Sequence, residues 1–137
     1  MGLYLAIFDG DDELDGVEVG SYADFSAFRS AVAVHLEGGV AGSRYPTLML
    51  HSDCDGQWSP DESAVLAAEL AAITEGFMDL PAEPLGEGWK PRVAKSLGLR
   101  PANLYDCFFD VDGEPLLDRF MGLTQLSVER GLPILFQ

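Results

Sequence analysis

The chain has 137 residues, of which 23 are acidic and 8 are basic, so its formal net charge is −15. A protein this acidic repels phosphate backbones and anionic lipid headgroups, so direct binding to nucleic acid or to a membrane surface is not expected. Hydrophobic residues make up 47% of the chain, which is typical of a globular protein. The length predicts a single domain over residues 1–137.

The sequence also lacks the usual signals for export. No apolar run approaches the roughly 20 residues that span a bilayer. Residues 1–4 lack the basic start of a signal peptide, and Asp9 comes too early for its apolar segment. We therefore expect a soluble, cytoplasmic protein. Two cysteines, Cys54 and Cys107, are too few for a disulfide scaffold, and the sequence does not show whether the fold brings them close.

Hydrophobic patterning divides the chain into strands and helices. Short apolar runs between turn residues indicate strands, whereas apolar residues at helical spacing indicate helices. In chain order we expect a strand at 3–8, an acidic turn at 10–15, a short strand at 17–19, a helix at 22–37, a strand at 46–50, helices at 60–76 and 90–98, a helix that opens at 112–115 and runs to 130, and a strand at 132–136. Residues 104–111 are aromatic-rich and fit either a strand or irregular packing.

Cap residues define two helix starts and one helix end. Ser21 with Asp24, and Ser59 with Glu62, match the capping-box pattern, in which side chain and backbone satisfy each other at a helix start. Gly131 is suited to the end of the last helix. Together these elements predict an α+β fold: a single-domain mixed β-sheet of about four strands packed with about four helices.

The negative charge is concentrated in the first part of the chain. Residues 1–87 hold 17 acids and 2 bases, whereas residues 88–137 hold six of each. No base occurs among the seven acids from Asp9 to Asp24. The basic cluster of the second part is Lys90, Arg92, Lys95 and Arg100. Such asymmetry can steer a partner of opposite charge, although solubility accounts for it equally well.

The loop at residues 51–62 has the composition closest to a chemical site. Asp53, Asp55 and Glu62 match ligand positions of a calcium-binding loop, but His51 stands where an Asp is usual and a strand precedes the loop. Asx turns and a helix cap explain these residues more simply. We therefore predict no metal and no cofactor.

The same loop suggests a nucleophile and a base, as in a small hydrolase. His51, Cys54 and Asp55 are close in sequence. A thiol nucleophile requires an electropositive environment, however, and two carboxylates in this loop disfavour a thiolate. We therefore expect no enzymatic activity. A hydrolase-like or metal-binding use of the loop from His51 to Glu62, and a homodimeric interaction module, remain as alternatives.

The two tryptophans lie beside predicted loops. Trp is enriched among the residues that anchor protein interfaces, so Trp58 and Trp89 are candidate anchors. Burial as a lid over the core is the simpler interpretation of both.

Four stretches of the chain carry a family resemblance: Gly16–Phe25, Tyr45–Pro60, Phe109–Leu117 and Gly131–Gln137. They resemble bacterial immunity proteins of polymorphic toxin systems, in particular the immunity protein 70 family. The resemblance extends from about residue 3 to the end of the chain. It implies an α+β fold and binding to a cognate toxin domain that the protein blocks, and it implies no catalytic residues.

The resemblance and the charge together suggest where the toxin binds. Nuclease toxins present basic clefts, and complementary charge speeds encounter between partners. If the strands at 3–8 and 46–50 are parallel neighbours, the acidic loops that follow them emerge at the same end of the sheet. The predicted partner-binding residues are Asp9, Asp11, Asp12, Glu13, Asp15, Asp53, Asp55 and Trp58.

Overall fold

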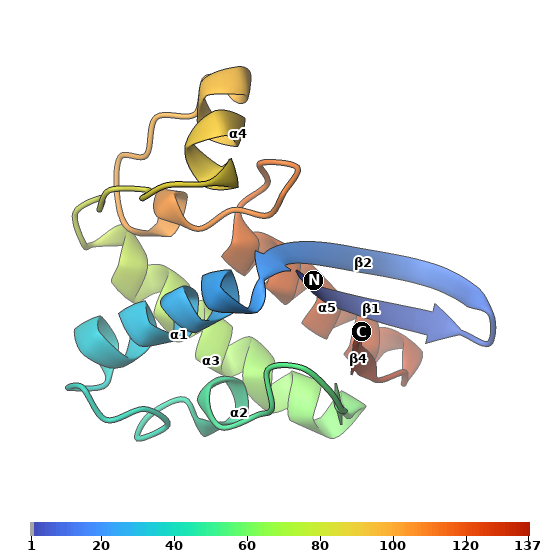
Figure 1. The fold of residues 1–137 in the computed structure, drawn as a ribbon. Coiled ribbons are helices and arrows are strands. Elements are labelled where there is room, and N and C mark those ends of the chain that lie inside the picture. The colour runs from blue at the N-terminus through green and yellow to red at the C-terminus, as the bar shows by residue number, and fades with distance from the viewer. Residues whose placement is uncertain (1) are drawn as a thin grey trace.

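The computed structural model describes residues 2–137, which form helices around one four-stranded sheet (Figure 1). In chain order the elements are β1 (Gly2–Asp9), β2 (Asp12–Ser21), α1 (Tyr22–Leu36), α2 (Pro46–Met49), β3 (Gln57–Trp58), α3 (Pro60–Met78), α4 (Trp89–Leu97), the 3₁₀ turn η1 (Tyr105–Cys107), α5 (Leu116–Arg130) and β4 (Ile134–Phe136). No helix within residues 2–137 is long and apolar enough to cross a membrane.

The strand order in the sheet is β2-β1-β4-β3, and every pair of neighbours is antiparallel. The predicted α+β class is confirmed, but the sheet is antiparallel rather than mixed. β1 and β2 form a long hairpin, and β4 pairs with β1 only at Leu5 and Ala6. The outer part of the hairpin therefore extends beyond the other two strands, as Figure 1 shows at its right side.

Apolar side chains from β1 and β2 join those of α1, α3 and α5 in one buried cluster. Phe28 of α1 packs edge-on against Phe77, Phe108 and Phe120, with ring centroids 6.1, 5.4 and 5.9 Å apart. These aromatic contacts stabilise the core beyond the area that they bury. The α1 face that helical spacing predicts to be apolar is therefore the face that meets the core.

Both predicted capping boxes are present. Ser21 Oγ accepts from the N–H of Asp24, and Ser59 Oγ accepts from the N–H of Glu62, each at 3.1 Å. The two carboxylates accept in return from the backbone N–H of Ser21 and Ser59, at 2.7 and 3.0 Å. Helices α1 and α3 therefore begin where the sequence predicts. Gly131 ends α5 with a φ of 66°, a left-handed conformation that glycine adopts at little cost.

The predicted strand at residues 46–50 is wrong, because Pro46–Met49 forms the short helix α2. The apolar run of Leu48, Met49 and Leu50 has no periodicity that separates a short strand from a helical turn. Pro46 favours a helix start, since its fixed φ suits the first helical position.

Contacts from distant residues stabilise α2 at both ends. At its N-terminus the Glu69 carboxylate accepts from the N–H groups of Thr47 and Leu48, at 3.2 and 3.0 Å. At its C-terminus Arg29 Nη1 donates to the carbonyl oxygens of Leu48 and His51, at 3.2 and 2.8 Å. A carboxylate at the N-terminus and a guanidinium at the C-terminus complement the helix dipole. These long-range contacts override the strand propensity of the apolar run.

Two further regions are the short strand β3 and the aromatic-rich segment 104–111. β3 was not predicted, because two residues are too few for a strand pattern to show. Residues 104–111 form η1 and an isolated bridge between Phe109 and Pro115, which is the irregular packing alternative. The strands at 3–8, 17–19 and 132–136 are confirmed, the second as part of the longer β2.

Candidate partner interface

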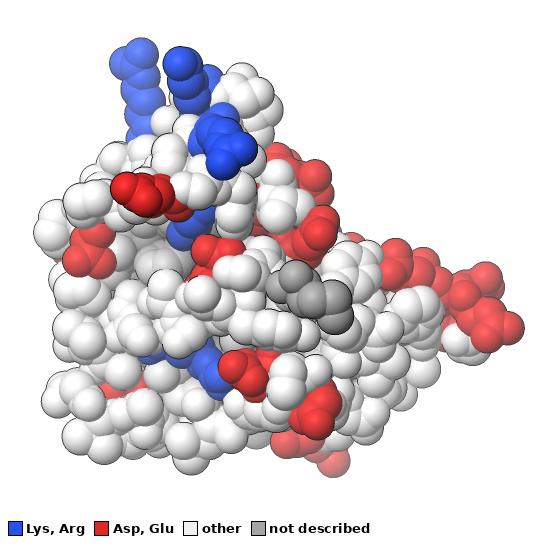
Figure 2. Space-filling view, viewed as in Figure 1, with Lys and Arg blue, Asp and Glu red and all other residues white. Residues whose placement is uncertain are grey.

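The hairpin tip presents five of the eight predicted partner-binding residues. We define the acidic hairpin tip as Asp9, Asp11, Asp12, Glu13 and Asp15. The first four are exposed and Asp15 is half-buried. Figure 2 shows acidic side chains on the part of the molecule that projects to the right, and basic side chains gathered at the top. Gly10 connects the strands with a φ of 63°, which a tight two-residue hairpin loop requires.

The charge of the tip is not neutralised within the fold. Asp9 and Asp12 are direct partners in the β1–β2 register, and like charges facing each other destabilise a hairpin. Among residues 2–137, the only ion pair that involves the tip joins Asp15 to Arg119. Asp9, Asp11, Asp12 and Glu13 therefore keep charge that a basic partner could neutralise.

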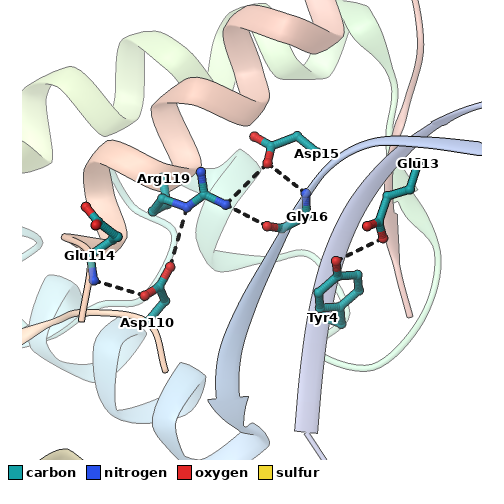
Figure 3. Close-up of polar contacts among 7 residues, drawn as sticks. All are labelled: Tyr4, Glu13, Asp15, Gly16, Asp110, Glu114 and Arg119. Atoms are coloured by element: carbon teal, nitrogen blue, oxygen red, sulfur yellow. Dashed lines mark hydrogen bonds and ion pairs between the residues drawn. The ribbon is translucent and has the colours of Figure 1, made fainter. Parts of the chain in front are cut away.

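Arg119 of α5 anchors the base of the acidic hairpin tip. Its Nη2 donates to the carbonyl oxygen of Gly16 at 2.6 Å and lies 3.2 Å from Asp15 Oδ1 (Figure 3). Its Nε lies 3.4 Å from Asp110 Oδ2. One guanidinium thus links β2 to the turn before α5, which fixes the direction in which the hairpin projects.

Asp110 is buried, with 2% of its side chain exposed, and its charge is compensated by several partners. Its Oδ1 accepts from the backbone N–H groups of Asp112 and Glu114, each at 3.0 Å, while its Oδ2 faces Arg119. A buried charge is tolerated when it is paired and hydrogen-bonded in this way. The Asp110-x-Asp112-Gly pattern is therefore a turn that supports the hairpin.

Tyr4 orients one acid of the tip. Its hydroxyl donates to Glu13 Oε1 at 2.9 Å, and its ring lies so close to Gly16 that a Cβ at that position would collide with it. Burial, the hydrogen bond to Glu13 and neighbouring carboxylates raise the pKa of Tyr4 above its ordinary value. The phenol therefore stays protonated at neutral pH and keeps donating to Glu13.

The structure does not bring the loop of Asp53 and Asp55 together with the acidic hairpin tip. β1 and β3 are both antiparallel to β4, so they run in the same direction. The loop precedes β3 whereas the tip follows β1, and the two therefore lie at opposite ends of the sheet. The expected parallel neighbours do not exist, because residues 46–49 form the helix α2 and no strand follows them before β3.

Trp58 is not an exposed anchor. Only 1% of its surface is accessible, and its Nε1 donates to the Thr47 carbonyl oxygen at 3.0 Å. The centroid of its ring lies 4.7 Å from that of the Phe136 ring. It covers the core, as the simpler interpretation predicts. Trp89 is half-buried and donates from Nε1 to Asp24 Oδ2 at 2.9 Å, which fastens α4 to the start of α1.

Both ring nitrogens of His51, the residue that suggested a catalytic base, contact backbone carbonyl groups. His51 Nδ1 lies 2.8 Å from the Ser52 carbonyl oxygen, and Nε2 lies 2.9 Å from that of Gln57. The His51 ring also stacks on Phe136, with centroids 4.3 Å apart. Cys54 is exposed, and both it and the buried Cys107 are free thiols. Within residues 2–137 no group of three or more His, Cys, Asp or Glu side chains could hold a metal ion.

A cleft of about 410 Å³ lies between α1 and the segment before α4. Lys90 lines it, with Nζ 4.6 Å from the centre of the Phe108 ring. Burial lowers the pKa of Lys90, and the charge of Asp24 partly offsets this effect. Asp24 is itself bound to Trp89, and Cys107 Sγ lies 3.4 Å from the carbonyl oxygen of Glu83. The bond between Trp89 and Asp24 holds α4 against α1, and the contact of Cys107 with Glu83 holds the preceding segment against η1.

Arg119, Tyr4 and Gly16 are the residues of this interface that sequence reasoning missed. Arg119 follows an acidic turn, and nothing in its neighbourhood indicates that its partner lies 103 residues away. Tyr4 alternates with buried residues of β1, so its outward direction could be predicted but its bond to Glu13 could not, because that depends on register.

Comparison with protein families gives a match over nearly the whole chain. The family model for Immunity protein 70 matches residues 3–136, which is nearly the whole chain. No curated protein and no solved structure matches. The region matched includes the acidic hairpin tip, Arg119 and the turn that supports it. The chain therefore belongs to the Immunity protein 70 family.

Proposed function

We propose that this chain is an immunity protein that binds and neutralises a cognate toxin, and that the acidic hairpin tip is its contact surface. The observation that supports the tip is its unneutralised charge on a projecting, anchored hairpin. Like charges kept opposite each other at a cost in stability are expected where a function requires them. Binding needs no catalytic group of this chain.

The charge of the tip specifies the kind of toxin surface that it fits. A cleft lined with Lys and Arg, such as the substrate cleft of a nuclease, is complementary to the exposed carboxylates of the tip. The carboxylates would take the place of substrate phosphates and exclude the substrate. Charge complementarity of this kind raises the association rate and discriminates against other partners.

The test is co-expression with a candidate toxin domain, sought in the genes adjacent to the one that encodes this chain, with bacterial growth as the readout. A tip variant replaces four acids: Asp9→Asn, Asp11→Asn, Asp12→Asn and Glu13→Gln. A matched control variant removes four exposed acids elsewhere: Glu75→Gln, Asp79→Asn, Glu87→Gln and Glu129→Gln. Both variants lose the same formal charge, so they separate the position of the charge from its total.

We expect wild type and the control variant to restore growth and to bind the toxin domain in calorimetry. We expect the tip variant to protect poorly and to bind about tenfold or more weakly, since several charge pairs are lost at once. Failure of the wild-type chain to bind the toxin would contradict the proposed function. Equal protection by both variants would instead contradict the placement of the contact surface.

A further inference from the structure

We infer that the toxin contributes a short, arginine-bearing extended segment that pairs with the outer edge of β2 at Glu13. This inference rests on the proposed function and specifies how the acidic hairpin tip is recognised. It depends on the backbone geometry of the hairpin as well as on its charge, because an unpaired strand edge can bind another strand through main-chain hydrogen bonds.

The strand register identifies which backbone groups face the open edge. Ala6 pairs with Gly16 on one side and with Leu135 of β4 on the other, and it directs its N–H and C=O toward β4. In an antiparallel pair, the opposite residue then directs its own groups away from β1. Gly16 accordingly faces outward. Phe8 and Glu13 are the corresponding pair two residues farther out on β1, although the register shifts by one residue between the two pairs and leaves Leu14 as the extra residue of β2. Phe8 keeps the direction of Ala6, so Glu13 opposite it also faces outward.

The inner part of this edge is already covered by the chain itself. The N–H of Val111 donates to the Glu18 carbonyl oxygen at 3.2 Å, and Arg119 donates to that of Gly16. Beyond Gly16 the cover ends: among residues 2–137, no backbone hydrogen bond other than those to β1 reaches Asp12, Glu13 or Leu14. The open part of the edge thus lies beyond the register shift at Leu14, next to the part that the fold closes.

Arg119 indicates the chemistry that suits the open part. Its guanidinium contacts a β2 carbonyl oxygen and the neighbouring Asp15 carboxylate at the same time (Figure 3). Glu13 repeats this combination, since its carbonyl faces the same edge and the carboxylate of Asp12 adjoins it. The forked guanidinium of arginine suits such paired acceptors better than the point charge of lysine.

The test compares two substitutions at one position in binding to the same toxin domain. Glu13→Ala removes the charge and the side-chain acceptor of Tyr4 but keeps the backbone N–H, whereas Glu13→Pro removes the outward N–H as well. Proline is tolerated on an edge strand where its N–H faces solvent, so the fold should persist, and circular dichroism checks it. We expect Glu13→Pro to bind about tenfold or more weakly than Glu13→Ala, as when a hydrogen bond at an interface is left unmade.

Hydrogen exchange of the wild-type complex gives a second readout that needs no variant. The amide of Glu13 should exchange slowly in the complex and rapidly in the free protein. Equal affinities of the two variants, or an amide of Glu13 that exchanges as fast in a stable complex as in the free protein, would overturn strand pairing while leaving the proposed function intact. A wild-type chain that fails to bind the toxin domain would contradict both.

Discussion

Asp9 and Asp12 face each other across the last residue pair of the hairpin, and neither has a basic neighbour within the described chain. The buried carboxylates, by contrast, have hydrogen-bond partners. Asp110 is satisfied by two N–H groups and Arg119, and Glu69 by the N-terminus of α2. The buried carboxylates of Asp110 and Glu69 are therefore paired, whereas Asp9 and Asp12 at the acidic hairpin tip repel each other. This contrast predicts opposite effects of mutation on stability and on binding.

Asp12→Asn should stabilise the free protein by about 0.2–1 kcal/mol, because it removes a repulsive cross-strand pair. The same substitution should weaken toxin binding. Urea denaturation at low ionic strength measures the first effect, which added salt should reduce. Glu87→Gln, in an exposed loop, is the control and should change neither quantity appreciably. Destabilisation by Asp12→Asn would show that the repulsion is not significant.

At the scale of elements, side chains from distant helices determine where the short elements form. α2 has four residues and is held by Glu69 of α3 and Arg29 of α1. α4 is held against α1 by the hydrogen bond from Trp89 to Asp24. Helices this short are not stable alone, because the first turn is costly to form. Their stability should therefore depend on single partners.

Glu69→Ala should lower the free energy of unfolding by about 1–3 kcal/mol, because it leaves the buried N–H of Leu48 without a partner. Glu69→Gln keeps one acceptor oxygen and should cost less. Glu75→Ala lies on the exposed face of the same helix and serves as the control for helix propensity. Equal losses from Glu69→Ala and Glu75→Ala in denaturation experiments would contradict this role of Glu69.

Asp24 makes the attachment of α4 sensitive to acid. Burial by itself would raise the pKa of Asp24, but hydrogen bonds from Trp89 and Ser21 and the charge of Lys90 lower it below 3.8. A carboxyl group with a depressed pKa contributes stability that is complete above the unfolded value and disappears as the pH falls through the folded value. Wild type should therefore lose more stability than Asp24→Asn below pH 3.8.

Denaturation measured from about pH 5 to about pH 2 tests this expectation, and the curves of wild type and Asp24→Asn should converge at the acidic end. Trp89→Phe removes the indole donor and should also reduce the dependence on pH. Parallel curves for wild type and Asp24→Asn would mean that Asp24 does not couple folding to protonation.

At the scale of the whole molecule, charge is distributed unequally over the surface. Acidic side chains occupy the projecting hairpin, whereas exposed bases gather around α4 (Figure 2). The exposed bases in and next to this helix are Arg92, Lys95 and Arg100. A net charge of −15 attracts a basic partner, and we expect this asymmetry to orient the molecule so that the hairpin faces the partner on approach.

The association rate with the toxin domain should fall as salt is raised from about 0.05 to about 0.5 M, because ions screen exposed charges over about 10 Å at 0.1 M. The tip variant should show a flatter salt dependence than the control variant, although both lose four acids. Stopped-flow mixing measures both slopes. Identical slopes would mean that total charge, and not the acidic hairpin tip, steers the encounter.

Local chemistry allowed much of the fold to be predicted from the sequence alone. The capping boxes of Ser21 and Ser59 involve residues three positions apart, so the starts of α1 and α3 follow from the sequence. The apolar run before Asp9 likewise predicts β1. The excess of acids between Asp9 and Asp15 was also visible in the sequence, because charge depends only on composition.

Only the tertiary structure decided which of these acids lie together. Residues 46–49 of the predicted strand form a helix because Glu69 and Arg29 satisfy its ends. The strand that would have brought Asp53 to the hairpin is therefore absent. Trp58 is buried because β3 pairs with β4, from the far end of the chain. Such pairings depend on residues distant in sequence, and local patterns carry no information about them. The sequence by itself thus determined the charge and most elements, and long-range contacts determined the surface.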